Sequence, residues 1–224
     1  MHKKNKKILF IHHLESIGGG ERYLANVINS LSDSYDIFLL TPNSNTELEK
    51  ELNVNITKVS KKFSRNFGPF PSLSISLYKQ IRKLIKEDKI DIIHILDHYT
   101  LPALVLIKII YPVKIVFSSR GEWDTHFLIN RLLLKVLNPI TSVNTPIQYF
   151  RVNKLVDKTF LMPSFYYKDR EYKNRRIESD LNLGIVGRFS PVKNHTFAFE
   201  IVSKLDLNYK LHVFGGKTLN IQEE

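Results

Sequence analysis

Two basic residues, Arg188 and Lys193, stand five positions apart in the stretch GRFSPVKNH. An apolar run precedes this stretch and an amphipathic segment follows it, so we expect a loop between a strand and a helix. The free N–H groups and the dipole at the start of a helix favour an anion. A guanidinium can hold a diphosphate through two hydrogen bonds, and an ammonium can hold it as a point charge. The pair indicates a diphosphate site, but a surface pair of cations beside a loop has the same spacing.

A glycine loop near the N-terminus is a second candidate for phosphate chemistry. Gly18, Gly19 and Gly20 precede Glu21 and would let backbone approach a ligand without a Cβ in the way. A dinucleotide turn would need a third glycine or alanine where Tyr23 stands, and an acid at the tip of the next strand, which instead ends LLTP. A P-loop would need Lys and then Ser or Thr after its glycines. NAD or FAD binding and a P-loop are therefore disfavoured, which leaves a glycine loop without a local anchor for its ligand.

The segments that must position these loops alternate between apolar runs and amphipathic stretches. Residues 7–13 are typical of a buried strand, residues 21–31 of a helix with one apolar face, and YDIFLLTP of a second strand. The alternation continues with SLSISLYKQIRKLIKED as a helix, IDIIHIL as a strand, TLPALVLIKIIY as a mostly buried helix, VKIVFSS as a strand, HFLINRLLLKVL as a helix, and ITSVN and TFLMP as strands. This order predicts a doubly wound parallel α/β domain over residues 1–162.

The pattern stops at residues 163–180, which are rich in charge and lack apolar periodicity, as a linker would be. Residues 181–224 then repeat strand, loop, helix and strand at nearly the spacing of residues 8–41. A lone βαβ unit cannot cover both faces of its sheet. We therefore expect a complete Rossmann-like domain, a linker, and the first βαβ of a second Rossmann-like domain that the chain leaves unfinished.

Composition excludes several classes of protein. Of the 224 residues 43% are hydrophobic and 14 are Phe, which is ample for a core and excludes global disorder. The chain has no cysteine, so disulfides and a Cys-ligated zinc are excluded. The apolar run near the N-terminus is too short for a signal peptide, and charges and a proline interrupt the longest apolar stretch, LPALVLIKIIYPVKIVF. We expect a cytoplasmic protein without a membrane span.

The net charge of +11 favours an anionic partner, such as a phosphorylated ligand or an acidic lipid surface. The cations are scattered along the chain and no nucleic-acid-binding motif accompanies them, so we expect no nucleic acid partner. In FSRNFGPFPS (residues 63–72), which precedes a basic helix, three Phe interleave with Lys61, Lys62 and Arg65. The pattern suits contact of this segment and the following helix with an anionic membrane interface, and equally a packed surface loop.

Six segments between residues 7 and 216 together resemble the retaining family 4 glycosyltransferases of the GT-B fold. IGGGERYLANVINSL resembles that family's first loop and helix, DIIHILDHYTLPAL its D-x-x-H strand, and KIVFSSRGEWD its acceptor-side strand and turn. FLMPSF resembles the strand at the domain crossover, GIVGRFSPVKNHTFAFEIVSKL the G-R-x-x-x-x-K donor loop, and YKLHVFGG the next strand with its glycine turn. The resemblance implies a GT-B fold, with an acceptor-side domain followed by a donor-side domain.

The resemblance also implies roles for individual residues. Arg188 and Lys193 would neutralise the donor diphosphate as its bond to the sugar breaks. The first loop and the acceptor-side turn would contact donor or acceptor, and four further residues would lie near the cleft. The loop residues are Gly18, Gly19, Gly20 and Glu21, the turn residues Arg120, Gly121 and Glu122, and the cleft residues His94, Asp97, Gly215 and Gly216. No cofactor beyond the nucleotide-diphosphate sugar is implied.

Four histidines raise the question of a metal. They are His12, His13, His94 and His98, and they fall on different predicted elements without a carboxylate partner in ligand spacing. No Asp-x-Asp motif is present either. We expect no metal site, and we expect His94 to be structural and close to the cleft.

Two features depart from the family's pattern. Arg120 precedes Gly121 where many members carry histidine, which indicates a variant acceptor site. The family's Glu-x7-Glu motif, which contacts the donor sugar and ribose, would lie beyond Glu224. We therefore expect little or no activity from the chain alone.

The function implied is transfer of a sugar from a nucleotide-sugar donor to a polysaccharide or lipid-linked glycan of the cell envelope, at the inner face of the membrane. Two alternatives stay open. One is a sugar-nucleotide 2-epimerase of the same fold, which would need catalytic groups in a completed second domain. The other is a non-catalytic binding protein, including the remnant of a split gene.

Overall fold

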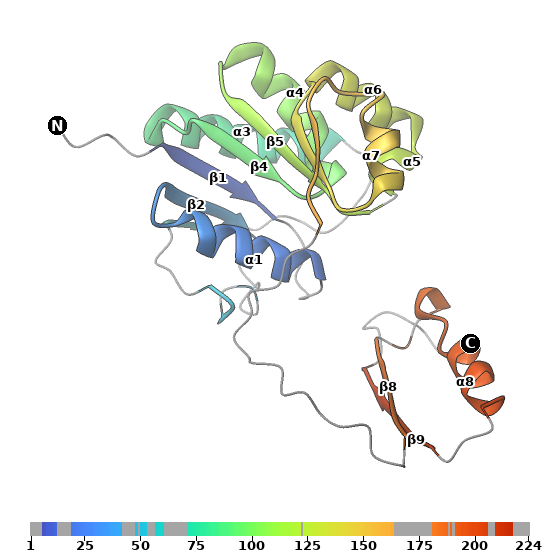
Figure 1. Ribbon diagram of the computed structural model, residues 1–224. Helices are drawn as coiled ribbons and strands as arrows, with labels where there is room; N and C mark the ends of the chain where they lie inside the picture. Colours follow the sequence, from blue (N-terminus) through green and yellow to red (C-terminus); the bar gives the residue numbers. More distant parts are fainter. Residues whose placement is uncertain are drawn as a thin grey trace. The chain divides into compact units, whose positions relative to one another are not determined.

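The computed structural model describes residues 6–12, 19–41, 48, 50–52, 57–60, 71–121, 123–163, 181–187, 189, 191–205 and 209–216. The chain divides into two compact units, Met1–Tyr167 and Lys168–Glu224 (Figure 1). Residues 164–180, nearly all of the predicted linker, lie outside the described residues, and the predicted domain boundaries stay predictions.

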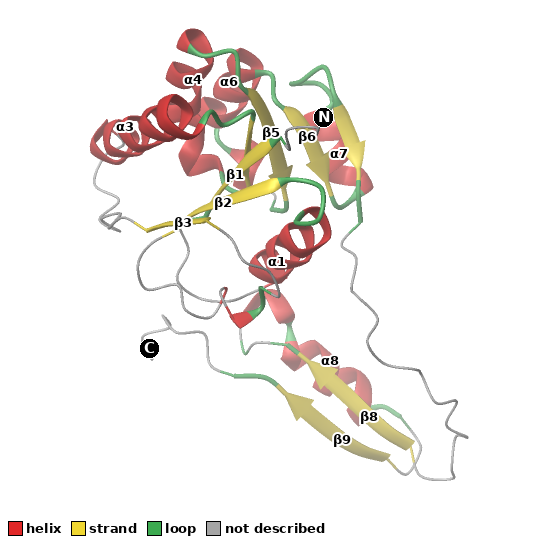
Figure 2. Ribbon diagram, turned by 90° about the vertical axis from the view of Figure 1, so that its left-hand side faces the viewer, coloured by secondary structure: helices red, strands yellow, loops and turns green. Residues whose placement is uncertain are grey.

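The first unit is built on a parallel sheet with the strand order β3-β2-β1-β4-β5-β6-β7 (Figure 2). The strands are β1 (Lys7–Ile11), β2 (Asp36–Thr41), β3 (Thr57–Ser60), β4 (Ile92–Ile95), β5 (Lys114–Ser119), β6 (Ile140–Val143) and β7 (Thr159–Leu161). The central strand β1 pairs with β2 on one side and β4 on the other, so that Phe10 stands opposite Leu39 and His94. The strand order changes direction between β1 and β4, which makes the carboxyl ends of these strands the topological switch point of the sheet.

Helices cover both faces of this sheet. They are α1 (Gly19–Leu31), α3 (Pro71–Asp88), α4 (Leu101–Ile110), α5 (Trp123–His126), α6 (Leu128–Leu137) and α7 (Pro146–Val152), with a short 3-10 helix η1 (His98–Thr100) before α4. On one face Leu24 and Ile28 of α1 pack against Phe10 and Leu39. On the other face α3, α4 and α6 bury residues such as Ile81. Strands enclosed on both faces must be apolar throughout, which explains runs such as KILFI.

The predicted fold class is confirmed, with local differences. A helix was expected over HFLINRLLLKVL, but the chain bends at Phe127, whose backbone is extended, and α5 and α6 are separate. Strand β3 and helix α7 were not predicted. Thr145 caps α7 and Pro146 occupies its first turn, a combination typical of helix starts that the sequence does contain. The expectation that α4 is mostly buried was wrong, because Leu106, Ile109 and Ile110 on its outer side are exposed.

The second unit is a single βαβ of β8 (Leu181–Val186), a short 3-10 helix η2 (Pro191–Lys193), α8 (His195–Ser203) and β9 (Tyr209–Phe214). Its two strands are parallel and in register from Leu181 opposite Tyr209 to Val186 opposite Phe214. Asn194 caps α8 by accepting a hydrogen bond from the Phe197 N–H at 3.3 Å. Many of its apolar side chains are exposed to solvent, and Val186 is 82% exposed.

Candidate functional site

Polar residues gather where the parallel strands of the first unit end. His12 follows β1, Asp97 and His98 follow β4, and Arg120 and Gly121 follow β5. The carboxyl edge of an open α/β sheet, at its switch point, is where such folds bind ligands. The sequence predicted several of these residues, and the structure brings them to one edge.

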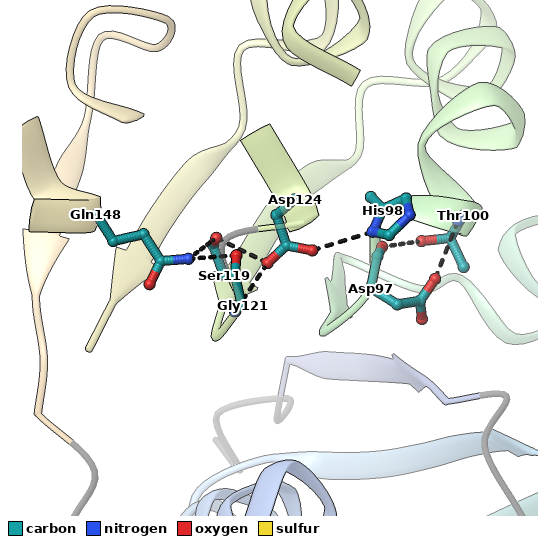
Figure 3. Close-up of polar contacts among 7 residues, drawn as sticks. All are labelled: Asp97, His98, Thr100, Ser119, Gly121, Asp124 and Gln148. Atoms are coloured by element: carbon teal, nitrogen blue, oxygen red, sulfur yellow. Dashed lines mark hydrogen bonds and ion pairs between the residues drawn. The ribbon is translucent and has the colours of Figure 1, made fainter. Parts of the chain in front are cut away.

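Asp124 is the centre of a hydrogen-bonded network at this edge (Figure 3). Its Oδ1 atom lies 3.1 Å from Nδ1 of His98, and its Oδ2 atom accepts a hydrogen bond from the Ser119 hydroxyl at 2.8 Å and one from the Gly121 N–H at 3.3 Å. A carboxylate only accepts, so the His98 proton sits on Nδ1 in this contact. The Nε2 atom is then the ring nitrogen left for another partner, and when neutral it accepts a hydrogen bond.

Gln148, in the first turn of α7, holds the same turn from the other side (Figure 3). Its Nε2 atom donates to the Ser119 hydroxyl and to the Gly121 carbonyl, both at 2.7 Å. Gln148 and Asp124 are buried, so these polar atoms satisfy one another away from water. Residues 119–121 are therefore fixed from two helices, which makes the turn after β5 a rigid part of the edge.

Asp97 sets the position of His98. Its Oδ1 atom accepts from the Thr100 N–H at 3.1 Å and caps η1, while the Thr100 hydroxyl donates to the Asp97 carbonyl at 3.0 Å (Figure 3). Asp97, which was predicted to lie near the cleft, thus stabilises the short helix η1 that carries His98.

His94 is buried below this edge. Its Nε2 atom is 2.7 Å from the Ser118 hydroxyl, which lies 2.8 Å from the Ser142 hydroxyl. Burial, and to a smaller extent the positive charge of Arg120, lower the pKa of His94 to about 4. His94 is therefore neutral at physiological pH and links β4 to β5 and β6.

Arg120 connects the edge to two distant segments. Its guanidinium carbon lies 3.5 Å from the centre of the Tyr23 ring in α1, and its Nη1 atom donates to the Met162 carbonyl at 3.0 Å. Burial lowers the pKa of Arg120. Arg120 was predicted as part of a variant acceptor site, and the structure shows that it also ties β5 to α1 and to the segment after β7.

The first glycine loop is described only from Gly19 onward, and Gly18 lies outside the described residues. Gly19 and Gly20 open α1, and a Cβ added at either would meet no atom within 4 Å. Packing within the chain therefore does not require these glycines. Glu21 is buried, with its Oε1 atom 3.7 Å from Nε2 of His12.

In the second unit, Lys193 and the glycine turn after β9 lie at one edge of the β8–β9 pair. The Lys193 side chain packs beside Gly187, where an added Cβ would be 3.5 Å from Lys193 Cγ. The Gly187 N–H donates to the Phe214 carbonyl at 2.9 Å, and the Phe189 N–H donates to the Gly216 carbonyl at 3.2 Å, next to Gly215. Arg188, and Glu122 of the first unit, lie outside the described residues.

Sequence reasoning missed the centre of the site. His98 was considered only as a metal ligand, for which no carboxylate stands in ligand spacing. Its partner Asp124 lies 26 residues further along the chain, a separation that carries no sequence signal. His12 likewise lies beside Glu21. Gln148, Ser118 and Ser142 were not singled out, since a lone amide or hydroxyl carries no spacing signal. Among the described residues, no group of three or more His, Asp or Glu could hold a metal ion.

Comparison with known proteins identifies the family. The family model described as Glycosyltransferase Family 4 matches residues 17–155, a range that runs from the first glycine loop past the end of α7. The chain belongs to glycosyltransferase family 4. The predicted family is thereby confirmed. No curated protein matches the chain.

Solved structures of family-like enzymes share the fold. HepE from Anabaena, in complex with UDP and glucose, superposes with a TM-score of 0.69 at 15% identity, over 96% of this chain and 62% of its own. The lipopolysaccharide outer core galactosyltransferase WaaB gives 0.63 at 16%, over 95% and 61%. A UDP-N-acetylglucosamine 2-epimerase gives 0.60 at 11%, over 93% and 63%. The chain thus spans a little over three fifths of each of these proteins.

Proposed function

We propose that this family 4 chain serves the transfer of a sugar from a nucleoside diphosphate sugar to a polysaccharide or lipid-linked glycan of the cell envelope. The observation that carries the proposal is the family match over residues 17–155, because this range contains the whole carboxyl-edge network of the first unit. HepE, which shares the fold, is solved with UDP and glucose, and WaaB is a galactosyltransferase. Both support a nucleotide sugar as donor.

In this proposal the second unit binds the donor diphosphate. Arg188 and Lys193 neutralise the charge that grows on the leaving phosphate as the glycosidic bond breaks, so that they bind the transition state more tightly than the ground state. The reaction retains the anomeric configuration without a protein nucleophile, and the acceptor proton passes to the departing phosphate. No metal is required for these steps.

The first unit then holds the acceptor. His98 presents Nε2 at the carboxyl edge, with its ring oriented by Asp124 through Nδ1. A neutral Nε2 accepts a hydrogen bond from a sugar hydroxyl and fixes its orientation. The rigid turn at residues 119–121 supplies a fixed wall for the same group.

The protein would work at the cytoplasmic side of a membrane that carries a lipid-linked acceptor. Within the described ranges, no helix combines the length and the apolar character that crossing a bilayer requires. Contact with the membrane would then be peripheral. Of the aromatic and cationic stretch first considered for this contact, residues 63–70 lie outside the described residues, and residues 71 and 72 begin α3.

The competing function in the same fold is epimerisation of a nucleotide sugar, since a UDP-N-acetylglucosamine 2-epimerase superposes on the chain. An epimerase changes its sugar nucleotide without an acceptor, whereas a transferase releases the nucleotide diphosphate to an acceptor. A non-catalytic protein would do neither.

The test measures nucleotide binding to the 224-residue chain by NMR. The ligands are UDP, UDP-glucose and UDP-N-acetylglucosamine. We expect shifts in the amide signals of Gly187, Lys193 and Gly216, and we expect Lys193→Gln to weaken binding about tenfold. Lys204→Gln, at the far end of α8, is the matched control and should leave binding unchanged. Absence of any shift, or equal binding by Lys193→Gln and the parent, would overturn the donor site.

A further inference from the structure

The outer face of α6 is apolar where a helix on a soluble protein is normally polar. Its buried positions are Asn130, Leu134 and Leu137. Residues spaced by four share one face of a helix, and Leu128, Leu132 and Val136 form such a row on the side opposite the buried positions. These three side chains are 79%, 55% and 58% exposed. The solvent side of α6 therefore carries a row of exposed apolar side chains.

The neighbouring helix α4 continues this surface. It buries Leu101, Leu104 and Ile107 and exposes Leu106, Ile109 and Ile110 on its outer side, with Ile109 75% exposed. Helices α3, α4 and α6 lie side by side in one layer over the same face of the sheet (Figures 1 and 2). We call the six outward side chains of α4 and α6 the apolar face; they are Leu106, Ile109, Ile110, Leu128, Leu132 and Val136.

Positive charge surrounds the apolar face. The segments LPALVLIKII and LINRLLLKVL contain Lys108, Arg131 and Lys135 and no acidic residue. On α3, the cations lie on the side opposite the buried Leu77, Ile81 and Leu84. These cations are Lys79, Arg82, Lys83 and Lys86, of which Lys83 is paired with Glu87 at 3.6 Å. Arg82 reaches the end of α4, where its Nε atom donates to the Tyr111 hydroxyl at 3.0 Å.

An apolar centre beside a cationic rim is the pattern of helices that lie in a membrane interface, with apolar side chains in the acyl boundary and cations at the headgroups. Contiguous apolar patches of this kind are rare on monomeric soluble proteins. Docking of a second copy through the same face would bring Arg131 and Lys135 toward identical charges. Charge complementarity therefore favours an anionic lipid surface as the occupant.

We propose that the apolar face of α4 and α6 inserts into the interface of an anionic membrane while the cations of α3 contact lipid headgroups. Binding to a membrane would bring the chain to a lipid-linked acceptor. The purpose of the apolar face therefore rests on the proposed function.

Co-sedimentation of the 224-residue chain with vesicles tests the proposal. We expect binding to vesicles of phosphatidylcholine with phosphatidylglycerol, weaker binding in high salt, and little binding to phosphatidylcholine alone. Ile109→Glu and Leu132→Glu should each lower the partition coefficient about tenfold or more. Ile201→Glu, an exposed apolar residue of α8, is the matched control and should bind like the parent. Circular dichroism checks that each variant is folded.

A second measurement locates the contact without relying on loss of binding. The chain has no cysteine, so single cysteines at Leu132, Ile109 and Ser30 can each carry one environment-sensitive fluorophore. Ser30 is exposed on α1, on the opposite face of the sheet. Anionic vesicles should shift the emission to the blue at positions 132 and 109 and leave position 30 unchanged.

An absence of emission shifts at all three sites, or equal shifts at all three, would overturn the proposal. So would a third outcome, in which the parent chain does not bind vesicles but forms a dimer, and Leu132→Glu makes it monomeric. The last outcome would assign the apolar face to a protein partner. Neither measurement uses a nucleotide sugar, so failure here leaves the proposed transferase standing, and failure of nucleotide binding leaves the membrane surface standing.

Discussion

The guanidinium carbon of Arg120 lies 3.5 Å from the centre of the Tyr23 ring, so a residue at the end of β5 is held against the first turns of α1. The contact joins the two loops that the sequence marked as candidates for ligand binding. The guanidinium suits this place because its planar group stacks on the ring while Nη1 donates to the Met162 carbonyl, whereas an ammonium lacks the planar surface that stacks.

We expect Arg120→Lys to lower the free energy of unfolding of the first unit by about 1–2 kcal/mol. Combining it with Tyr23→Leu in a double-mutant cycle should give a coupling energy of about 1 kcal/mol. Urea unfolding measures both, and Arg131→Lys on exposed α6 serves as the matched control. Strictly additive effects of the two substitutions would show that the stack contributes nothing.

The stability of the first unit should depend on pH through His94. Its pKa is about 4 in the folded protein and about 6.5 when unfolded, so between these values the unfolded chain binds more protons. The stability that depends on neutral His94 is fully present above pH 6.5. As the pH falls toward 4, the free energy of unfolding decreases by about 3 kcal/mol.

Urea unfolding between pH 7 and 4 checks this prediction by comparing the parent with His94→Gln. Loss of the contact with Ser118 lowers the stability of the variant at every pH, so the decisive quantity is the slope of stability against pH. We expect a shallower loss of stability with acid in His94→Gln than in the parent. Identical slopes would mean that His94 does not titrate between folded and unfolded states.

Asp124→Asn should destabilise the first unit by about 1–3 kcal/mol, because the amide cannot accept all the hydrogen bonds that His98, Ser119 and the Gly121 N–H direct at the carboxylate. Thermal unfolding gives the change, and Asp33→Asn on the surface after α1 should have little effect. An unaltered melting temperature for Asp124→Asn would show that the network does not hold the turn.

Catalysis gives a prediction for an enzyme in which the second domain is completed from a family relative. Arg188→Ala and Lys193→Ala should each lower kcat roughly a hundredfold, since each removes a charge contact on the leaving diphosphate worth on the order of 3 kcal/mol. Arg188→Lys should also be damaging, because an ammonium lacks the two-pronged geometry. If the enzyme that carries both Arg188→Ala and Lys193→Ala turned over at the parental rate, the assignment of this loop to the donor diphosphate would be wrong.

Amide exchange should separate the two units of the 224-residue chain. The sheet of the first unit is covered on both faces, whereas β8 and β9 expose side chains such as Val186 and Phe214. We expect amides of β1 and β4 to exchange at least tenfold more slowly than those of β8 and β9. Equal protection across both units would contradict this expectation.

The sequence by itself determined most of the strand and helix segments and the two candidate loops, because hydrophobic periodicity and glycine are local signals. It could not say that Leu128 and Leu132 point away from the protein, since the neighbouring α4 decides which side of α6 is buried. Tertiary structure alone decided the site: His98, Asp124 and Gln148 follow different strands, and they meet because β4, β5 and β6 lie side by side with their carboxyl ends at one edge. No local pattern encodes that strand order, so a dyad separated by 26 residues becomes visible only when the sheet is assembled.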